Sequence, residues 1–180
     1  MELHRALWQK ASDAAVQAVL AAHPDAAKEK DGYGKLPLHY LSTTVAVVQA
    51  VLAVHPDAAK EKDGDGMLPL LCALALVNEA SDAVVQAVLA AHPDAAKEKD
   101  GSGMLPLQYA LAQKASDAVV QAVLATYPIA SLYKVAGYSP LDFALARGVG
   151  VSRGTLAALA QLDTLTLLAD PTKYVDLVTA

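Results

Sequence analysis

The sequence predicts an all-α fold, a helical-repeat solenoid of about five helix-turn-helix units joined by short turns. The first observation is a repeated segment, VVQAVLAAHPDAAKEK at Val84–Lys99, which recurs with small changes at Val47–Lys62 and Ala15–Lys30. The second is an Asp-Gly pair after each copy, with spacings of 32 and then 37 residues along the chain. The third is a decayed fourth copy that starts at Val119. Periods of this size are typical of stacked repeats.

Within the first unit, an apolar pattern that begins at Leu3 is followed by the joint Ala11-Ser12-Asp13 and a second helix at Ala14–Ala22. Ser12 or Asp13 can cap that helix, because a side-chain oxygen can accept from one of its free N–H groups. His23 precedes a proline, which disfavours the helical conformation and predicts that the helix ends there. The glycine-rich turn at 31–34 then leads to Pro37, in the first turn of the next helix.

The later units follow the same plan, with length changes confined to the joint between the two helices. From the leucine after the proline to the first of the paired valines, the distance is 9 residues in the second unit, 14 in the third and 12 in the fourth. We expect units at residues 1–30, 31–62, 63–99, 100–134 and 135–165, and a C-terminal tail or cap at 166–180. The last unit is rich in leucine, so either the tail covers it or it docks on another chain.

Composition excludes several classes of function. The longest uninterrupted apolar run, Met67–Val77, is shorter than the ~18–20 residues that a membrane-spanning helix needs, and this predicts no membrane insertion. Glu2, His4 and Arg5 interrupt the start of the chain and argue against a secretory leader. The net charge of −5 counts against nucleic-acid binding. The single cysteine, Cys72, rules out an internal disulfide and indicates a reducing compartment, so we expect a soluble, intracellular and cytoplasmic protein.

A four-times-repeated box with proline and leucine at its second and third positions resembles the T-P-L-H-x-A signature of ankyrin repeats. The resemblance covers roughly residues 1–165 and implies ankyrin-like units that stack through their Leu, Val and Ala faces. Leucine replaces the threonine of the family in three boxes, which predicts that leucine packing, in place of a hydroxyl-to-imidazole hydrogen bond, holds the corner of those units. The four boxes are Leu36–Leu41, Leu68–Ala73, Leu105–Ala110 and Ser139–Ala144.

Residues that could suggest chemistry have simpler structural interpretations. His23, His55 and His92 lie on successive units, too far apart to converge on one zinc ion, so we interpret them as helix ends. Asp63-Gly64-Asp65-Gly66 resembles the start of a calcium loop, but Leu74 stands where that loop requires glutamate. Cys72 is interpreted as a small buried hydrophobe. We therefore predict no enzyme activity, no metal and no cofactor.

Two interpretations of the lysine-rich segments remain open. Lys28, Lys60 and Lys97 begin three Lys-Glu-Lys-Asp runs that would form a ladder of charge along one edge. These runs are either a solvated face or a stripe for an acidic partner.

The resemblance also implies a binding surface, because ankyrin-like arrays make contacts through turn tips and the exposed side of the first helix of each unit. Trp8 is the only tryptophan, a residue type that dominates interface energetics. Thr43 and Thr44 belong to the same set by position. The predicted contact residues are Trp8, Gln9, Tyr33, Lys35, Asp65, Met67, Leu76, Ser102, Met104, Gln113, Tyr138 and Arg147.

The functional expectation is a non-catalytic protein–protein interaction scaffold that binds a protein partner of unknown identity on its concave face, as a monomer or as a component of a hetero-complex. One alternative is a structural subunit permanently built into a larger assembly. A second alternative is the regulatory part of a catalyst whose chemistry lies on another chain.

Overall fold

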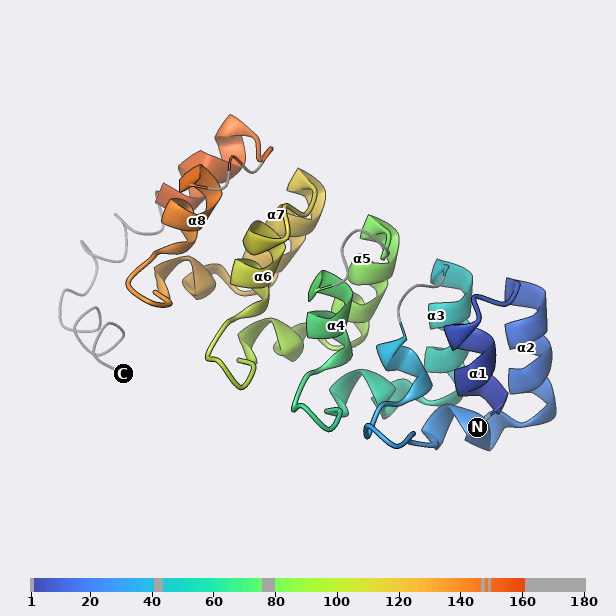
Figure 1. Ribbon diagram of the computed structural model, residues 1–180. Helices are drawn as coiled ribbons and strands as arrows, with labels where there is room; N and C mark the ends of the chain where they lie inside the picture. The colour runs from blue at the N-terminus through green and yellow to red at the C-terminus, as the bar shows by residue number, and fades with distance from the viewer. Residues whose placement is uncertain (1, 41–43, 76–79, 147, 149, 161–180) are drawn as a thin grey trace.

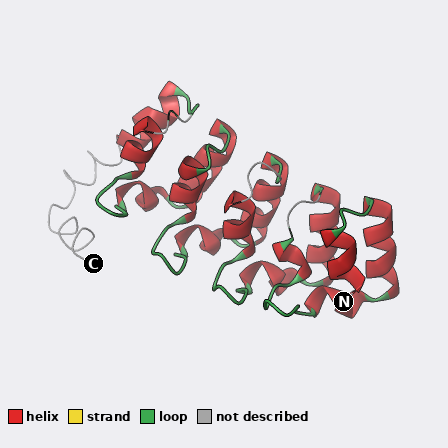
Figure 2. Cartoon of the chain, in the orientation of Figure 1, coloured by secondary structure: helices red, strands yellow, loops and turns green. Residues whose placement is uncertain are grey.

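The computed structural model describes residues 2–40, 44–75, 80–146, 148 and 150–160. Within those residues the chain is all-helical, and the extended structure is a single bridge between Val135 and Tyr138 (Figure 2). The α-helices are α1 (Glu2–Trp8), α2 (Asp13–Ala22), α3 (Val45–Val54), α4 (Pro69–Ala75), α5 (Asp82–Ala91), α6 (Pro106–Ala112), α7 (Asp117–Thr126), α8 (Pro140–Ala146) and residues 153–160. The 3₁₀-helices are η1 (Pro24–Lys28), η2 (Pro37–His39), η3 (Pro56–Lys60), η4 (Pro93–Lys97) and η5 (Pro128–Leu132).

The helices form two neighbouring layers. We call α1, η2, α4, α6 and α8 the first helices, and each contacts the next in that order. The second helices are α2, α3, α5 and α7, which likewise contact one another in sequence. Residues 153–160 lie against α7, where the Thr155 hydroxyl donates to Asp117 and accepts from Gln121. Figure 1 shows the first helices in front of the second helices along an elongated molecule, with the turns projecting from its lower edge.

The core lies between these two layers. The side chains of Leu70, Leu107 and Val84 are fully buried, as are Ala59 and Ala96 of the 3₁₀-helices. Alanine at the 3₁₀ positions leaves room for a neighbouring helix to approach, which is why η3 and η4 each contact the following pair of helices. Burial of a leucine or valine contributes about 1.5–3 kcal/mol, so these contacts between neighbours are the main source of stability.

The second helices begin and end where the sequence predicts. Ser12 is the N-cap of α2, and its hydroxyl accepts from the backbone N–H of Ala15 at 3.3 Å; Thr44, Ser81 and Ser116 cap the next three second helices in the same way. His23 is the C-cap of α2, as predicted, and His55, His92 and Tyr127 hold that position in the others. Cap bonds also join units, since the Thr44 hydroxyl donates to Asp13 at 2.6 Å.

The second unit departs from the prediction at Pro37. Instead of the first turn of an α-helix, Pro37 starts the three-residue 3₁₀-helix η2. The joint of this unit is the shortest, with 9 residues between Leu38 and Val47 against 14 in the third unit, so the chain leaves the first-helix layer sooner. The expected joint residue Thr43 lies outside the described residues.

The prediction that leucine packing alone holds the corner of the box is wrong in two of the three leucine boxes. The backbone N–H of Leu36 donates to Nδ1 of His39 at 3.1 Å, and Nε2 of the same imidazole lies 3.3 Å from the carbonyl oxygen of Met67 in the next unit. Gln108 accepts from the backbone N–H of Leu105 at 2.6 Å in the same way, and its amide donates at 2.8 Å to the carbonyl oxygen of Tyr133, which stands at a different position from Met67. In these two units a polar side chain at the fourth box position therefore stabilises the corner.

The remaining boxes show the range of solutions at this corner. In the Ser139 box, Asp142 accepts from the backbone N–H and from the hydroxyl of Ser139, both at 2.8 Å. Leu71 occupies the same position in the third unit, where its apolar side chain is fully buried and cannot form such a bond. Leucine packing is the explanation for that unit only.

Candidate functional site

The turns of the second, third and fourth units are each built around one aspartate. One carboxylate oxygen of Asp31 accepts from the backbone N–H groups of Tyr33 at 2.8 Å and Lys35 at 2.9 Å. Asp63 and Asp100 make the corresponding pairs of bonds with the residues two and four positions later. Because an Asx turn of this kind fixes the loop backbone locally, side chains at the turn tips are held in defined positions.

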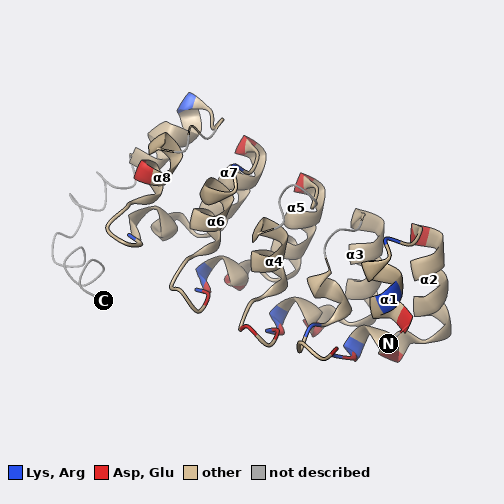
Figure 3. Cartoon of the chain, in the orientation of Figure 1, with Lys and Arg blue, Asp and Glu red and all other residues tan. Residues whose placement is uncertain are grey.

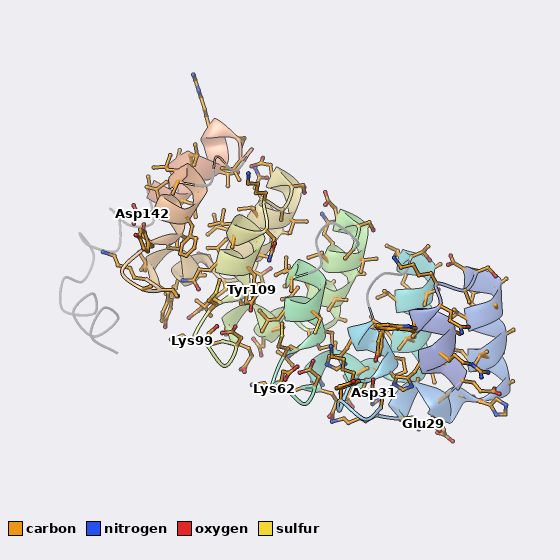
Figure 4. All side chains as sticks on the ribbon, viewed as in Figure 1. Glu29, Asp31, Lys62, Lys99, Tyr109 and Asp142 are labelled. Carbon is orange, nitrogen blue, oxygen red and sulfur yellow. The ribbon has the colours of Figure 1, made fainter. Side chains whose placement is uncertain are left out.

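The same aspartates tie each turn to the first helix that follows it. The second carboxylate oxygen of Asp31 accepts from the Tyr40 hydroxyl, and that of Asp100 accepts from the Tyr109 hydroxyl at 2.8 Å. Tyr109 and Asp31 are labelled in Figure 4, at the edge where the turns meet the first helices. In the third unit the partner of Asp63 is Cys72, whose sulfur is 4.0 Å away.

These hydrogen bonds determine the ionisation of the groups involved. Burial opposes ionisation of Asp31 and Asp100, but the bonds they accept outweigh it, and the pKa of each carboxyl is lowered. For Tyr40 and Tyr109, burial and then the bond to the aspartate raise the pKa to about 12. Both tyrosines therefore remain neutral hydrogen-bond donors at physiological pH.

Most of the predicted contact residues lie on the accessible surface. Trp8, Tyr33 and Tyr138 are 75%, 77% and 57% exposed. The polar residues Gln9, Asp65, Ser102 and Gln113 are exposed, whereas Lys35, Met67 and Met104 are half-buried. Leu76 and Arg147 lie outside the described residues, and Thr44 is exposed as the cap of α3.

The structure brings some of these residues together. The turns that carry Tyr33 and Asp65 are in contact, since the backbone N–H of Gly64 donates to the Tyr33 carbonyl at 2.9 Å. At the other end of the molecule, the ring of Tyr138 lies 6.1 Å from that of Phe143 in an edge-to-face arrangement.

An aromatic pocket at the N-terminal end was only partly predicted. The ring of Trp8 lies 6.2 Å from Tyr40, and Tyr40 lies 5.8 Å from His4, both in edge-to-face contacts. With two charged residues of α1 they line a pocket of about 420 Å³, which we call the Trp8 pocket and which consists of Glu2, His4, Arg5, Trp8 and Tyr40. Tyr40 was not among the predicted contact residues. The signal that could have identified it is the tyrosine that recurs at the fifth box position, in Tyr40 and Tyr109.

The opposite surface is chemically different. Where the second helices are exposed they present alanine and glutamine, including Gln17, Gln49, Gln86 and Gln121. Among the described residues the exposed large hydrophobic side chains are Trp8, Tyr33, Tyr138, Leu145 and Ile129. The first four lie on turns or first helices and Ile129 lies in η5, so exposed apolar bulk is concentrated on the predicted binding surface.

The lysine-rich segments are neutralised within the molecule. Lys30 pairs with Glu61 of the next unit at 3.0 Å, and Lys62 pairs with Glu98 at 2.9 Å. Lys28, Lys60 and Lys97 each pair with the aspartate three residues earlier. Figure 3 shows both signs of charge mixed along the turn edge of the molecule. These exposed pairs favour a solvated ladder over a stripe for an acidic partner.

The described residues hold few groups suited to catalysis or metal binding. Burial, followed by the nearby Asp63 carboxylate, raises the pKa of Cys72 to about 12, so its thiol stays protonated and is a poor nucleophile. No cluster of three or more metal-ligating side chains occurs in this part of the chain.

Among the described helices, none has the length and apolarity required to cross a membrane. No known family model matches the sequence, and a comparison with curated proteins found no similar one.

Proposed function

We propose that the chain is an ankyrin-like helical-repeat solenoid, with units at residues 1–30, 31–62, 63–99, 100–134 and 135–165. Three observations support this assignment. The helix pairs stack in chain order, a proline starts η2, α4, α6 and α8, and an aspartate or a bridge fixes each of the four turns. In such an array each unit contacts only its neighbours, so one face remains continuous along all units.

The function that the surface supports best is a non-catalytic scaffold that binds a protein partner through its turns and first helices. The observation that carries this proposal is the concentration of exposed Trp8, Tyr33, Tyr138 and Leu145 on that surface, opposite a face of alanine and glutamine. Trp and Tyr are enriched at interface hot spots, where a few side chains supply most of the binding energy. A continuous face of this kind could supply the ~20–30 residues of an ordinary interface.

The proposal is tested by affinity capture from a native cell extract with two variants. The first carries Trp8→Ala, Tyr33→Ala and Tyr138→Ala; the matched control carries Ile129→Ala, which removes exposed apolar bulk outside the proposed surface. All four substituted side chains are exposed, so both variants should fold, which circular dichroism checks. We expect the triple variant to lose a partner that wild type and the control retain.

Equal recovery of every partner by all three forms would remove this surface from consideration. If the retained proteins were a fixed set of stoichiometric subunits, the structural-subunit alternative would replace the scaffold. A copurifying enzyme activity would point to the regulatory alternative.

A further inference from the structure

The Trp8 pocket combines fixed aromatic rings with charged side chains from one face of a helix. Glu2, Arg5 and Trp8 are spaced three residues apart on α1 and therefore share a face. Tyr40 comes from the next unit, and its hydroxyl bond to Asp31 holds the ring in place. Nε2 of the His4 imidazole lies 2.9 Å from the carbonyl oxygen of Lys35, which anchors α1 to the same turn. The pocket is thus built before any ligand arrives.

Arg5 differs from several of the lysines near the turns. Lys28, Lys30 and Lys62 all form ion pairs of 2.9–3.0 Å, whereas Arg5 is exposed and has no ion pair within the described part of the chain. Glu2 lies three residues before Arg5, yet no salt bridge joins the two. An unpaired guanidinium beside two aromatic rings is suited to a carboxylate, which it binds through two parallel hydrogen bonds.

The order of charges along α1 determines what an occupant would meet. With a rise of about 1.5 Å per residue, Arg5 lies about 4.5 Å along the axis from Trp8 and Glu2 about 9 Å away. A ligand seated against the Trp8 and Tyr40 rings therefore meets the positive charge before the negative one. A cationic ligand at the rings would lie nearer to Arg5, which repels it, than to Glu2, which attracts it.

We propose that the Trp8 pocket binds a peptide segment in which an aspartate or glutamate stands next to a large apolar side chain. The apolar side chain packs against the Trp8 and Tyr40 rings, and the carboxylate pairs with Arg5. This inference rests on the proposed scaffold function and names the chemistry of the partner at one end of the surface.

The test is a selection from a random peptide display library with the full chain immobilised, run with wild type, Trp8→Ala and Arg5→Glu. Peptides enriched by wild type are synthesised, and their affinity is measured by fluorescence. Trp8 is the only tryptophan of the chain, so the emission reports on this pocket alone. Binding of the synthetic peptides to Trp8→Ala is followed by calorimetry.

We expect wild type to enrich peptides with an acidic residue beside an apolar one. Arg5→Glu should weaken binding of such a peptide by about tenfold or more, the effect of one charge-assisted hydrogen bond, and should prefer the peptide with lysine in place of the acidic residue. Circular dichroism of both variants guards against misfolding; the substituted side chains are exposed, so neither should disturb the core.

Three results would overturn the inference, and they differ in what they imply for the scaffold. Enriched peptides that need Trp8 but lack an acidic residue, or that are basic, would refute the partner chemistry and leave the scaffold proposal standing. Acidic peptides that bind the Arg5→Glu variant with the same affinity as wild type would also refute the partner chemistry and leave the scaffold proposal standing. Enrichment of no peptide, or only of peptides that ignore both substitutions, would refute the pocket and weaken the scaffold proposal together with it.

Discussion

Gly64→Ala probes the contact between the turns of the second and third units. A Cβ atom added at Gly64 would lie 2.5 Å from the carbonyl oxygen of Tyr33 and 3.2 Å from its carbonyl carbon. Both atoms belong to the backbone, which an Asx turn around Asp31 holds in place. The methyl group can be accommodated only if the two turns move apart, and that movement breaks the 2.9 Å bond from the Gly64 N–H to Tyr33.

The expected cost follows from these two effects. Loss of the backbone hydrogen bond costs about 0.5–1.5 kcal/mol, and overpacking of a tight contact costs about 1–3 kcal/mol. The free energy of unfolding should therefore fall by about 2–4 kcal/mol. For a chain of this size, a loss of that magnitude lowers Tm by roughly 4–16 °C.

Gly101→Ala is the matched control, since Gly101 follows Asp100 as Gly64 follows Asp63, yet a Cβ there would meet nothing within 4 Å. We expect this substitution to change stability by no more than about 0.5 kcal/mol. Urea and thermal unfolding followed by circular dichroism measure both variants. Equal effects of the two substitutions would refute the close approach of the two turns.

Three further substitutions test the corner, the core and the turn. His39→Gln should keep the bond from the Leu36 N–H, because Gln108 accepts the corresponding bond from Leu105 at the same box position. Burial lowers the pKa of His39, so wild type should lose stability as pH falls below about 6.5, and the variant should lose less in urea titrations at pH 7 and pH 5. Leu70→Ala should lower the free energy of unfolding by about 2–5 kcal/mol in the same assay, because the side chain is fully buried. Leu145→Ala should lower it little, because Leu145 is exposed. Similar values for the two variants would contradict the assigned core. The bonds accepted by Asp100 lower its pKa, so its contribution to stability is present above about pH 4 and is lost below that pH. Asp100→Asn should therefore lower stability at pH 7 and reduce the loss of stability at acid pH. An unchanged loss at acid pH would exclude this aspartate as the cause of that loss.

Local signals in the sequence were sufficient to predict where the second helices begin and end and where most of the first helices begin. The serine before each aspartate, the proline at the start of the box and the His-Pro pair act within a few residues of their own position, and Ser12, Pro106 and His92 stand where these rules place them. The short first helix of the second unit was missed, because the joint length that truncates it acts through packing between layers rather than through residue propensity.

The corner and the pocket could not be predicted in full, because they depend on pairs distant in sequence. His39 bonds to Met67, which lies 28 residues later, and Trp8 contacts Tyr40 of the adjacent unit. Of the residues that line the pocket, the resemblance had placed only Trp8 among the predicted contact residues. The exposure of Trp8, Tyr33 and Tyr138 was predictable because turn tips and outer helix faces are solvent-accessible in any stacked array. The charges beside Trp8 were visible in the sequence, but the absence of an ion pair for Arg5 among the described residues was not.

The one valine missing from the first copy of the repeated segment shows how packing explains a small sequence difference. Ala15 stands where the other copies have Val47, Val84 and Val119. Those three valines are buried, whereas Ala15 is exposed on α2. A valine at this exposed position would present two more methyl groups to water. The first unit thus carries the smaller apolar residue at this exposed position of α2. Trp8 on α1 is the exception, because it exposes a large apolar side chain, and it is the residue on which the binding proposals rest.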